Sequence, residues 1–146
     1  MFLSAQNNKG IYFDGADDIV EFSSTIIPDG ISNFTIEFWF KAETGLYTNQ
    51  GTNWAGIVGR HNGGSASRNP SVFIRDGEIH TDLRDATNNT TQYAIFSSGL
   101  ALSENTWYHL AWVKSGSKQY LYIDGILKDS ASAPSTCQVD YSYYLG

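Results

Sequence analysis

Cysteine and long apolar runs are the two things this chain most clearly lacks. Cys137 is the only cysteine among 146 residues, so no disulfide can form within the chain. The most apolar stretch, Ile36 to Phe40, is interrupted by Glu37 and is far shorter than the roughly 20 residues that cross a bilayer. We therefore expect a fold held by a non-covalent core and no insertion into a membrane.

Basic residues are also scarce. Nine Lys and Arg stand against 15 Asp and Glu, giving a net charge of −6, and they form no cluster. This balance argues against nucleic acid as a partner. The sequence has no G-x-S-x-G elbow, no phosphate-binding loop and no histidine spacing typical of zinc. We therefore expect neither a serine-hydrolase site, nor a phosphate-binding loop, nor a zinc site.

The residues that are present favour β-structure. The chain has 14 glycines, is 14% aromatic and shows no long stretch with a helical period. Its length suits one domain over residues 1–146, large enough for a single core. Short alternating runs between turn signals predict roughly nine or ten strands. The main predicted strands are residues 11–13, 19–22, 34–41, 55–60, 71–75, 78–84, 91–96, 107–114 and 119–124.

Residues 106–125 carry the most informative pattern. From Trp107 onward the side chains alternate, with His109 on one face and Leu110 and Trp112 on the other. A period of two with aromatic filling predicts a strand, and a short turn then leads to a second strand that ends in Asp124-Gly125. Both faces of the first strand are apolar, which predicts a hairpin covered on both sides.

This hairpin resembles the W-x-H-apolar-A strand, turn and L-Y-apolar-D-G strand of the laminin-G-like (concanavalin A-like) jelly-roll domains. Residues 13–22 are similar to the F-D-G-x-x-D-x-apolar opening of that family, and residues 33–41 to its F-T-I-E-x-W-apolar-K strand. Three segments in the right order make the resemblance specific. It implies an all-β fold, a two-sheet antiparallel jelly-roll sandwich. The single cysteine makes the chain more like bacterial or viral members, since many animal members carry a disulfide.

The alternation within the matched strands also predicts a set of core residues. These are Ile36, Phe38, Phe40, Leu121 and Ile123.

The resemblance further implies that the closing strands of the family are missing. Family members continue past the segment that Tyr143 to Gly146 resembles, through a further closing segment. We therefore expect a C-terminally incomplete fragment of a longer chain, or a domain that another chain completes. Either way, we expect an open sheet edge that pairs with another strand or copy.

Three carboxylates lie close together near the N-terminus, at Asp14, Asp17 and Asp18. Calcium takes about six to eight oxygen ligands, and a turn rich in carboxylates and carbonyls can supply several. Because the chain is similar to calcium-binding jelly-roll domains, we expect Ca²⁺ at low affinity here. The alternative is that Asp14 caps the Gly15 turn and that Asp17 or Asp18 is simply solvated.

One predicted strand carries four polar side chains on a single face, namely Glu78, His80, Asp82 and Arg84. It is similar to the E-x-D-x-E strand of retaining glucanases with this fold, which need two carboxylates about 5–5.5 Å apart. His80 replaces the central Asp and Asp82 replaces the second Glu. We therefore expect no enzymatic activity, and interpret this face as the water-facing side of an antiparallel strand.

Exposed aromatic and polar side chains on loops are the best candidates for contacting a ligand. The candidate ligand-binding residues are Tyr47, Trp54, Arg60, His61, Asn62 and Arg75. The resemblance implies a non-catalytic recognition or adhesion module that binds a glycan or a protein in an extracellular or particle-surface assembly. Two alternatives remain open: a structural subunit of a phage or cell-surface particle that assembles through strands, and a glycoside hydrolase.

Overall fold

The computed structural model describes residues 10–14, 16–22, 27–28, 30–43, 54–59, 70–85, 92–97, 99–137 and 143–145. Their regular structure consists of ten strands. The strands are β1 (Val20–Phe22), β2 (Asn33–Phe40), β3 (Ala55–Gly59), β4 (Ser71–Arg75), β5 (Glu78–Arg84), β6 (Gln92–Phe96), β7 (Tyr108–Ser115), β8 (Lys118–Ile123), β9 (Ile126–Ser132) and β10 (Tyr143–Leu145). These parts of the chain contain no helix long and apolar enough to cross a membrane.

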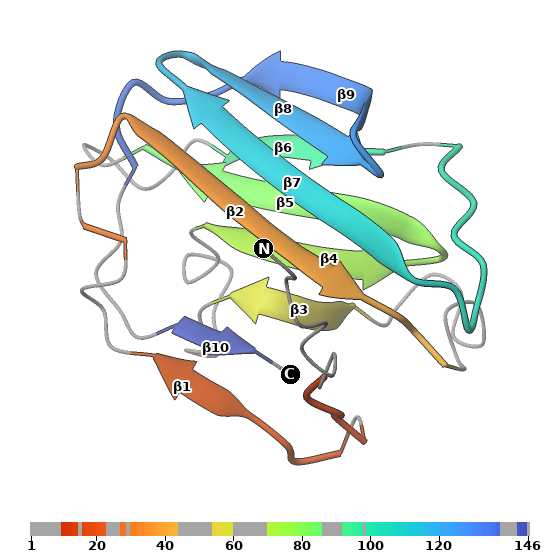
Figure 1. Cartoon of the computed structure of the whole chain (residues 1–146). Helices are drawn as coiled ribbons and strands as arrows, with labels where there is room; N and C mark the ends of the chain where they lie inside the picture. Colours follow the sequence, from red (N-terminus) through yellow and green to blue (C-terminus); the bar gives the residue numbers. More distant parts are fainter. Residues whose placement is uncertain are drawn as a thin grey trace, which may run out of the picture.

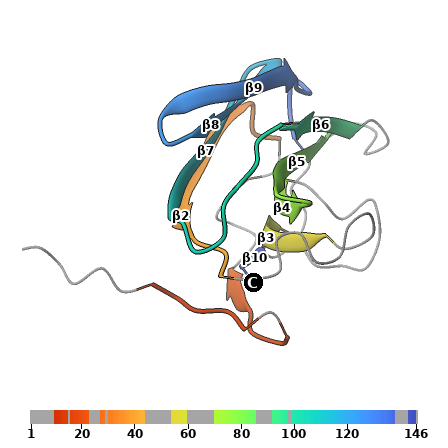
Figure 2. The same cartoon turned by 90° about the vertical axis from the view of Figure 1, so that its right-hand side faces the viewer.

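The strands form two sheets that pack face to face (Figures 1 and 2). The six-stranded sheet has the order β1-β10-β3-β4-β5-β6, and the four-stranded sheet has the order β2-β7-β8-β9. Every neighbouring pair is antiparallel. The predicted two-sheet antiparallel sandwich is confirmed.

Two tight turns set the register of the central hairpins. Asp76 and Gly77 both have positive φ, 50° and 74°, between β4 and β5. Asp124 and Gly125 repeat this conformation, at 51° and 75°, between β8 and β9. Two successive left-handed residues match the twist of the flanking strands, and Asp-Gly adopts this conformation at little cost. Asp124-Gly125 follows the predicted second strand of the hairpin, and Asp76-Gly77 lies between the strands predicted at residues 71–75 and 78–84.

The strand predicted at residues 11–13 is wrong. These residues are described but belong to no strand, and both Ile11 and Tyr12 are exposed. An apolar pair without a partner strand gains nothing from an extended conformation, so local pattern alone was insufficient here.

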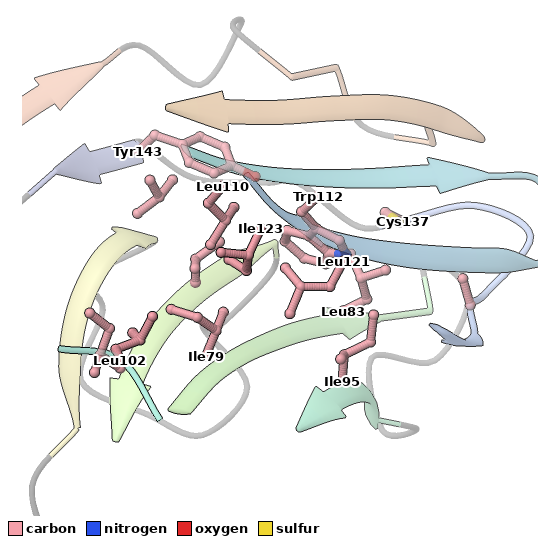
Figure 3. Close-up of a cluster of buried hydrophobic side chains, with 14 residues drawn as sticks. Ile79, Leu83, Ile95, Leu102, Leu110, Trp112, Leu121, Ile123, Cys137 and Tyr143 are labelled. Atoms are coloured by element: carbon pink, nitrogen blue, oxygen red, sulfur yellow. The ribbon is translucent and has the colours of Figure 1, made fainter. Parts of the chain in front are cut away.

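The core lies between the two sheets and is filled from their central strands (Figure 3). Its largest fully buried apolar side chains are Ile79, Leu83, Ile95, Leu110, Trp112 and Leu121. The predicted core positions Leu121 and Ile123 are confirmed. The predicted core position Phe38 is only half-buried, because β2 has a paired neighbour on one side alone.

Two other predicted core residues, Ile36 and Phe40, share this half-buried environment at the margin of the core. Apolar side chains on an edge strand keep one flank toward solvent even when they point inward. The three predicted β2 residues therefore pack against the core, but from its margin and only half-buried.

The outer face of the four-stranded sheet is open. Trp39 is 64% exposed and lies against His109, with ring centroids 5.1 Å apart. Ala111 and Val113, on the same face of β7, are half-buried. The hairpin is therefore not covered on both sides as expected, and its apolar outer face meets solvent.

Buried hydrogen bonds link the two sheets through Gln119. The Trp112 indole N–H and the Thr81 hydroxyl both donate to Gln119 Oε1, at 3.0 and 3.3 Å. The Gln119 amide N–H donates in turn to the Ser132 carbonyl at 2.9 Å. Thr81 belongs to β5 and the other three residues to the facing sheet, so the network joins the layers.

The buried Lys114 side chain connects three segments at one end of the four-stranded sheet by hydrogen bonds. The Lys114 ammonium donates to the carbonyl oxygens of Ser32, Gly116 and Ser135, at 2.6, 2.7 and 3.2 Å. These acceptors precede β2, join β7 to β8, and follow β9. Burial lowers the pKa of Lys114 from its ordinary value, and the three carbonyl oxygens take the place of water around its charge.

The strand closest to the C-terminus is not an edge strand. β10 pairs with β1 on one side and with β3 on the other. Among the described strands the outermost ones are β1 and β6 in one sheet and β2 and β9 in the other. The sequence predicted an open sheet edge at Tyr143–Leu145. That placement is wrong, because β10 is paired on both sides.

We expect Leu121→Ala to lower the free energy of unfolding by about 2–5 kcal/mol, because it leaves a cavity at a fully buried position. Phe38→Ala should cost less than the roughly 3–5 kcal/mol of a fully buried phenylalanine. Chemical denaturation of both variants provides the measurement. An equal or larger loss for Phe38→Ala would contradict the half-buried placement of β2.

Candidate functional site

The polar row predicted on β5 exists, but it is not water-facing. Ile79, Thr81 and Leu83 of β5 point into the core, so Glu78, His80, Asp82 and Arg84 share the opposite face, called here the outer face of β5. His80 is only 7% exposed and Asp82 only 3%. The interpretation of these two residues as solvated was therefore wrong.

Aromatic rings from three other segments surround His80. The strand register places Phe73 of β4 and Phe96 of β6 directly beside it, on either side. Trp54, just before β3, approaches the imidazole edge-on, with ring centroids 4.7 Å apart, and Phe96 does the same at 4.7 Å. Trp54 also contacts Phe73, at 5.9 Å between centroids. The histidine thus lies within an aromatic frame.

Two of the predicted ligand-binding residues meet beside this frame. The Arg75 guanidinium carbon lies 5.0 Å from the centre of the Trp54 ring, a cation–π geometry. Arg75 Nε also lies 3.4 Å from a carboxylate oxygen of Asp76. The other four predicted residues, Tyr47, Arg60, His61 and Asn62, lie outside the described residues.

Each carboxylate on β5 has its own partner. Glu78 lies 3.8 Å from His80 Nε2 and accepts a hydrogen bond from the Gly99 backbone N–H at 3.1 Å. Asp82 lies 3.7 Å from Arg84 Nε. The carboxylates are thus engaged separately, with His80 between them along the strand. This arrangement differs from the facing carboxylate pair that a retaining glycosidase uses.

Some buried polar atoms on this outer face have no hydrogen-bond partner in the structure. They include Ser71 Oγ and both ring nitrogens of His80. Each such group costs about 1–3 kcal/mol when it is removed from water without a partner. Gly59 permits the close approach here, since a Cβ at this position would lie 3.0 Å from Ser71 Oγ. The Ser71 hydroxyl and the His80 imidazole on this face therefore make no hydrogen bond within the fold.

Burial is the main influence on the titration of His80, and it lowers the pKa of the imidazole below 6.5. Glu78 opposes this shift, and Arg75 adds to it. The neutral imidazole is therefore favoured in the folded protein, with one ring nitrogen that can donate and one that can accept a hydrogen bond.

The acidic residues near the N-terminus do come together. Carboxylate oxygens of Asp14, Asp17 and Asp18 lie within 4.8 Å of one another, and all three residues are exposed. The Asp14 N–H donates to Asp18 Oδ2 at 3.0 Å, and the Ala16 N–H donates to Asp14 Oδ1 at 2.8 Å. Two backbone N–H groups of the turn therefore hydrogen-bond to its own carboxylates, as the alternative interpretation expected for Asp14. The three carboxylates also lie close enough together to bind one metal ion.

Phe73, Phe96 and Ser71 were missed by the sequence analysis. Alternation within their strands puts them on one face, but nothing in the sequence tells which strands are neighbours. His80 was recognised as polar and on the right face, yet it was assigned to solvent. The burial of His80 could be recognised only once the strand order was known, because the neighbouring strands supply the rings that cover it.

The sequence matches the model of the concanavalin A-like lectin/glucanases superfamily, in its laminin-G-like form, over residues 14–146. The chain belongs to this superfamily. The expectation drawn from its three sequence segments is thereby confirmed. No curated protein sequence matches it closely.

Solved structures share the fold at low sequence identity. A botulinum neurotoxin serotype D ligand binding domain in complex with N-acetylneuraminic acid is 21% identical, with a TM-score of 0.68 over 88% of this chain and 32% of that one. The binding domain of Paraclostridial Mosquitocidal Protein 1 is 19% identical, with a TM-score of 0.63 over 86% and 30%. Domains LG4-5 of the mouse laminin alpha1 chain are 13% identical, with a TM-score of 0.64 over 99% and 37%.

This laminin-G-like chain spans only about a third of the length of these solved structures, between 30% and 37%. At these identities the likeness establishes the jelly-roll fold and transfers no binding residue. The chemistry of the outer face must be argued from its own side chains.

Acidification should destabilise the protein through His80. Its folded-state pKa lies below the unfolded value, so the unfolded chain binds the proton more readily as pH falls. We expect the free energy of unfolding to decrease as pH drops below about 6.5 and on toward the lowered folded-state pKa. Denaturation between pH 8 and pH 5 measures this slope. His80→Gln should flatten this slope, and an unchanged slope in His80→Gln would contradict the assignment.

Calcium binding at the acidic turn remains a prediction. We expect Ca²⁺ to bind weakly, with heat detectable by titration calorimetry that is reduced when Asp17 and Asp18 are both changed to Asn. The physical reason is the loss of two carboxylate ligands from a cluster that holds three. No heat with the unaltered protein would show that the turn is purely structural.

Proposed function

We propose that this chain is a non-catalytic recognition module that binds a glycan on the outer face of β4, β5 and β6. Trp54 and Arg75 form the rim of this site, and His80 forms its floor. The module would act within an extracellular or particle-surface assembly. The observation that carries the proposal is the aromatic frame around buried polar atoms that have no hydrogen-bond partner in the fold.

The chemistry of the face suits a sugar. A hydroxyl group both donates and accepts hydrogen bonds, and this face contains the buried His80 imidazole and Ser71 hydroxyl as well as the Arg75 guanidinium at the end of β4. Aromatic rings such as Trp54 present flat apolar surface to the C–H side of a sugar ring. Ligand sites generally combine an apolar lining with a few placed polar groups, as this face does.

The balance of charge favours a neutral glycan. Arg75 and Arg84 carry positive charge on this face, while Asp76, Glu78 and Asp82 carry negative charge. Charges of both signs alternate at short distance, so their fields largely cancel. A strongly anionic or cationic ligand would therefore gain little from long-range attraction.

Membership of a superfamily of lectins and glucanases supports glycan recognition as a class. The solved relatives include a toxin ligand binding domain in complex with N-acetylneuraminic acid, so sialylated sugars belong among the probes. The engaged carboxylates on β5 support binding without hydrolysis.

A glycan array followed by calorimetry on the best neutral glycan tests the proposal. We expect Trp54→Ala and Arg75→Gln to weaken binding at least roughly tenfold, since such aromatic and arginine contacts are typical anchors. The bound glycan should remain intact after prolonged incubation.

The matched control is Trp39→Ala, the same change on the open face of the other sheet. It should leave glycan affinity unaltered, and melting temperatures should establish that all variants remain folded. Absence of binding to every glycan on the array would overturn the proposal. Cleavage of a glycan that ceases in Glu78→Gln would overturn its non-catalytic part.

A further inference from the structure

The outer face of the four-stranded sheet, called here the narrow-sheet face, carries apolar side chains across all four strands. Inward residues of these strands pack in or against the core, so the alternate residues form the outer face. These outer residues are Thr35, Glu37, Trp39, His109, Ala111, Val113, Tyr120, Tyr122, Leu127 and Ser130. Trp39 and Leu127 are exposed. Single exposed apolar residues are ordinary, but a patch that crosses a whole sheet marks an interaction surface.

The strand register arranges these residues in rows that run across the sheet. The first row consists of Glu37, Ala111, Tyr122 and Leu127, and the second row consists of Thr35, Val113, Tyr120 and Ser130. The ladder between β8 and β9 is irregular beside Tyr122, so the exposed Lys128 follows Leu127 as an extra residue at the end of the first row. In both rows a smaller side chain on β7 therefore lies next to a tyrosine on β8, and the first row has opposite charges at its two ends.

These rows are complementary to a second copy of themselves. A two-fold axis along the strands, midway between β7 and β8, places β7 of one copy over β8 of the other, and β2 over β9. Tyr122 then faces Ala111 of the second copy, and Tyr120 faces Val113, so that each tyrosine meets a smaller side chain. Every such contact occurs twice. An isologous interface requires a self-complementary patch of this kind.

The charges at the two ends of the first row also match in this arrangement. Glu37 faces Lys128 of the second copy, and this pair again occurs twice. Within one copy the two residues lie on the outermost strands of the sheet. Three strand spacings separate them by about 14 Å, whereas an ion pair needs about 4 Å. The two charges therefore cannot pair with each other unless a second copy is present.

Trp39 fits the same symmetry. Trp39 and His109 form a third row, which ends at the Asp124-Gly125 turn because the Asp124 N–H donates to the His109 carbonyl at 2.8 Å. The two-fold axis places Trp39 opposite this turn in the second copy. Gly125 has no side chain there, and the space beside it is open, so the indole can be accommodated.

The size of the narrow-sheet face suits a weak dimer. Its strands are six to eight residues long. With strand spacings of about 4.8 Å and a rise of about 3.3 Å per residue, the four strands present roughly 450 Å² from each copy. Two copies would together bury roughly 900 Å², close to the lower limit of specific interfaces. We therefore expect a dimer that dissociates at micromolar concentrations.

We propose that the chain forms a symmetric homodimer in which two narrow-sheet faces pack together with their strands aligned. Sheets that pack in this way keep their strand directions within about 30° of each other. A second copy suits the face better than a peptide or a sugar, because a copy supplies the matching side chain in each of the three rows. The outer faces of the two wide sheets then point away from each other, so the dimer does not depend on the proposed glycan site.

Sedimentation velocity of the complete chain, from about 1 to 500 μM, measures the association. The unaltered chain should pass from monomer to dimer within this range. Glu37→Lys and Lys128→Glu should each weaken the dimer about three- to tenfold, because each places like charges opposite each other twice. The two changes shift the net charge in opposite directions, so a loss in both cannot come from net charge.

The double variant Glu37→Lys/Lys128→Glu provides the decisive comparison. It exchanges the two charges and should restore the affinity of the unaltered chain. Because the two residues lie too far apart to interact within one copy, this recovery reports on contact between copies. Both are exposed residues, and melting temperatures should establish that all variants remain folded.

A matched pair of tryptophan variants distinguishes the two faces of the molecule. Trp39→Ala, on the narrow-sheet face, should weaken the dimer at least roughly fivefold, whereas Trp54→Ala, on the other sheet, should leave it unaltered. The proposal is overturned if the unaltered chain stays monomeric at the highest concentration, or if the double charge variant associates no more tightly than the single variants. Equal effects of the two tryptophan changes would overturn it as well.

Discussion

The side-chain amide of Gln119 is the contact on which the relation between the two sheets depends. Its carbonyl oxygen accepts hydrogen bonds from Trp112 in its own sheet and from Thr81 in the other. Thr81 Oγ1 in turn accepts a hydrogen bond from the Ile95 N–H at 3.3 Å. A buried amide must satisfy its hydrogen-bonding groups, so one relative position of the layers is strongly preferred over a slid alternative.

That constraint reaches the opposite face of β5 through the pleat of the strand. With Thr81 held inward between Ile79 and Leu83, the adjacent His80 and Asp82 must point outward. The register with β4 and β6 then fixes Phe73 and Phe96 on either side of His80. The positions of Phe73 and Phe96 in the aromatic frame are thus a consequence of core packing, and Trp54, just before β3, completes the frame. Such preorganisation favours recognition.

The sandwich is asymmetric in a way that separates two surfaces. One side closes where β6 meets β9, and on the other side no described strand pairs with the outer edge of β2. Buried polar side-chain atoms without a hydrogen-bond partner lie on the outer face of the wide sheet, at Ser71 and His80, while half-buried aromatic rings of β2 lie at the margin of the narrow sheet. The two surfaces therefore differ in chemistry: one contains buried polar side-chain atoms, and the other contains half-buried apolar rings.

Most of the strand pattern, the Asp-Gly turns and the all-β class could be predicted from the sequence, because they follow from interactions between residues near one another in the chain. The sequence also placed Trp54 and Arg75 among six candidate ligand-binding residues, and put Glu78, His80 and Asp82 on one face. The burial of His80 and Asp82 could not be predicted in this way, and neither could the outermost position of β2 or the inner position of β10. Burial and strand order depend on which distant segments become neighbours, and the alternation of side chains along a strand is the same at the centre of a sheet and at its edge.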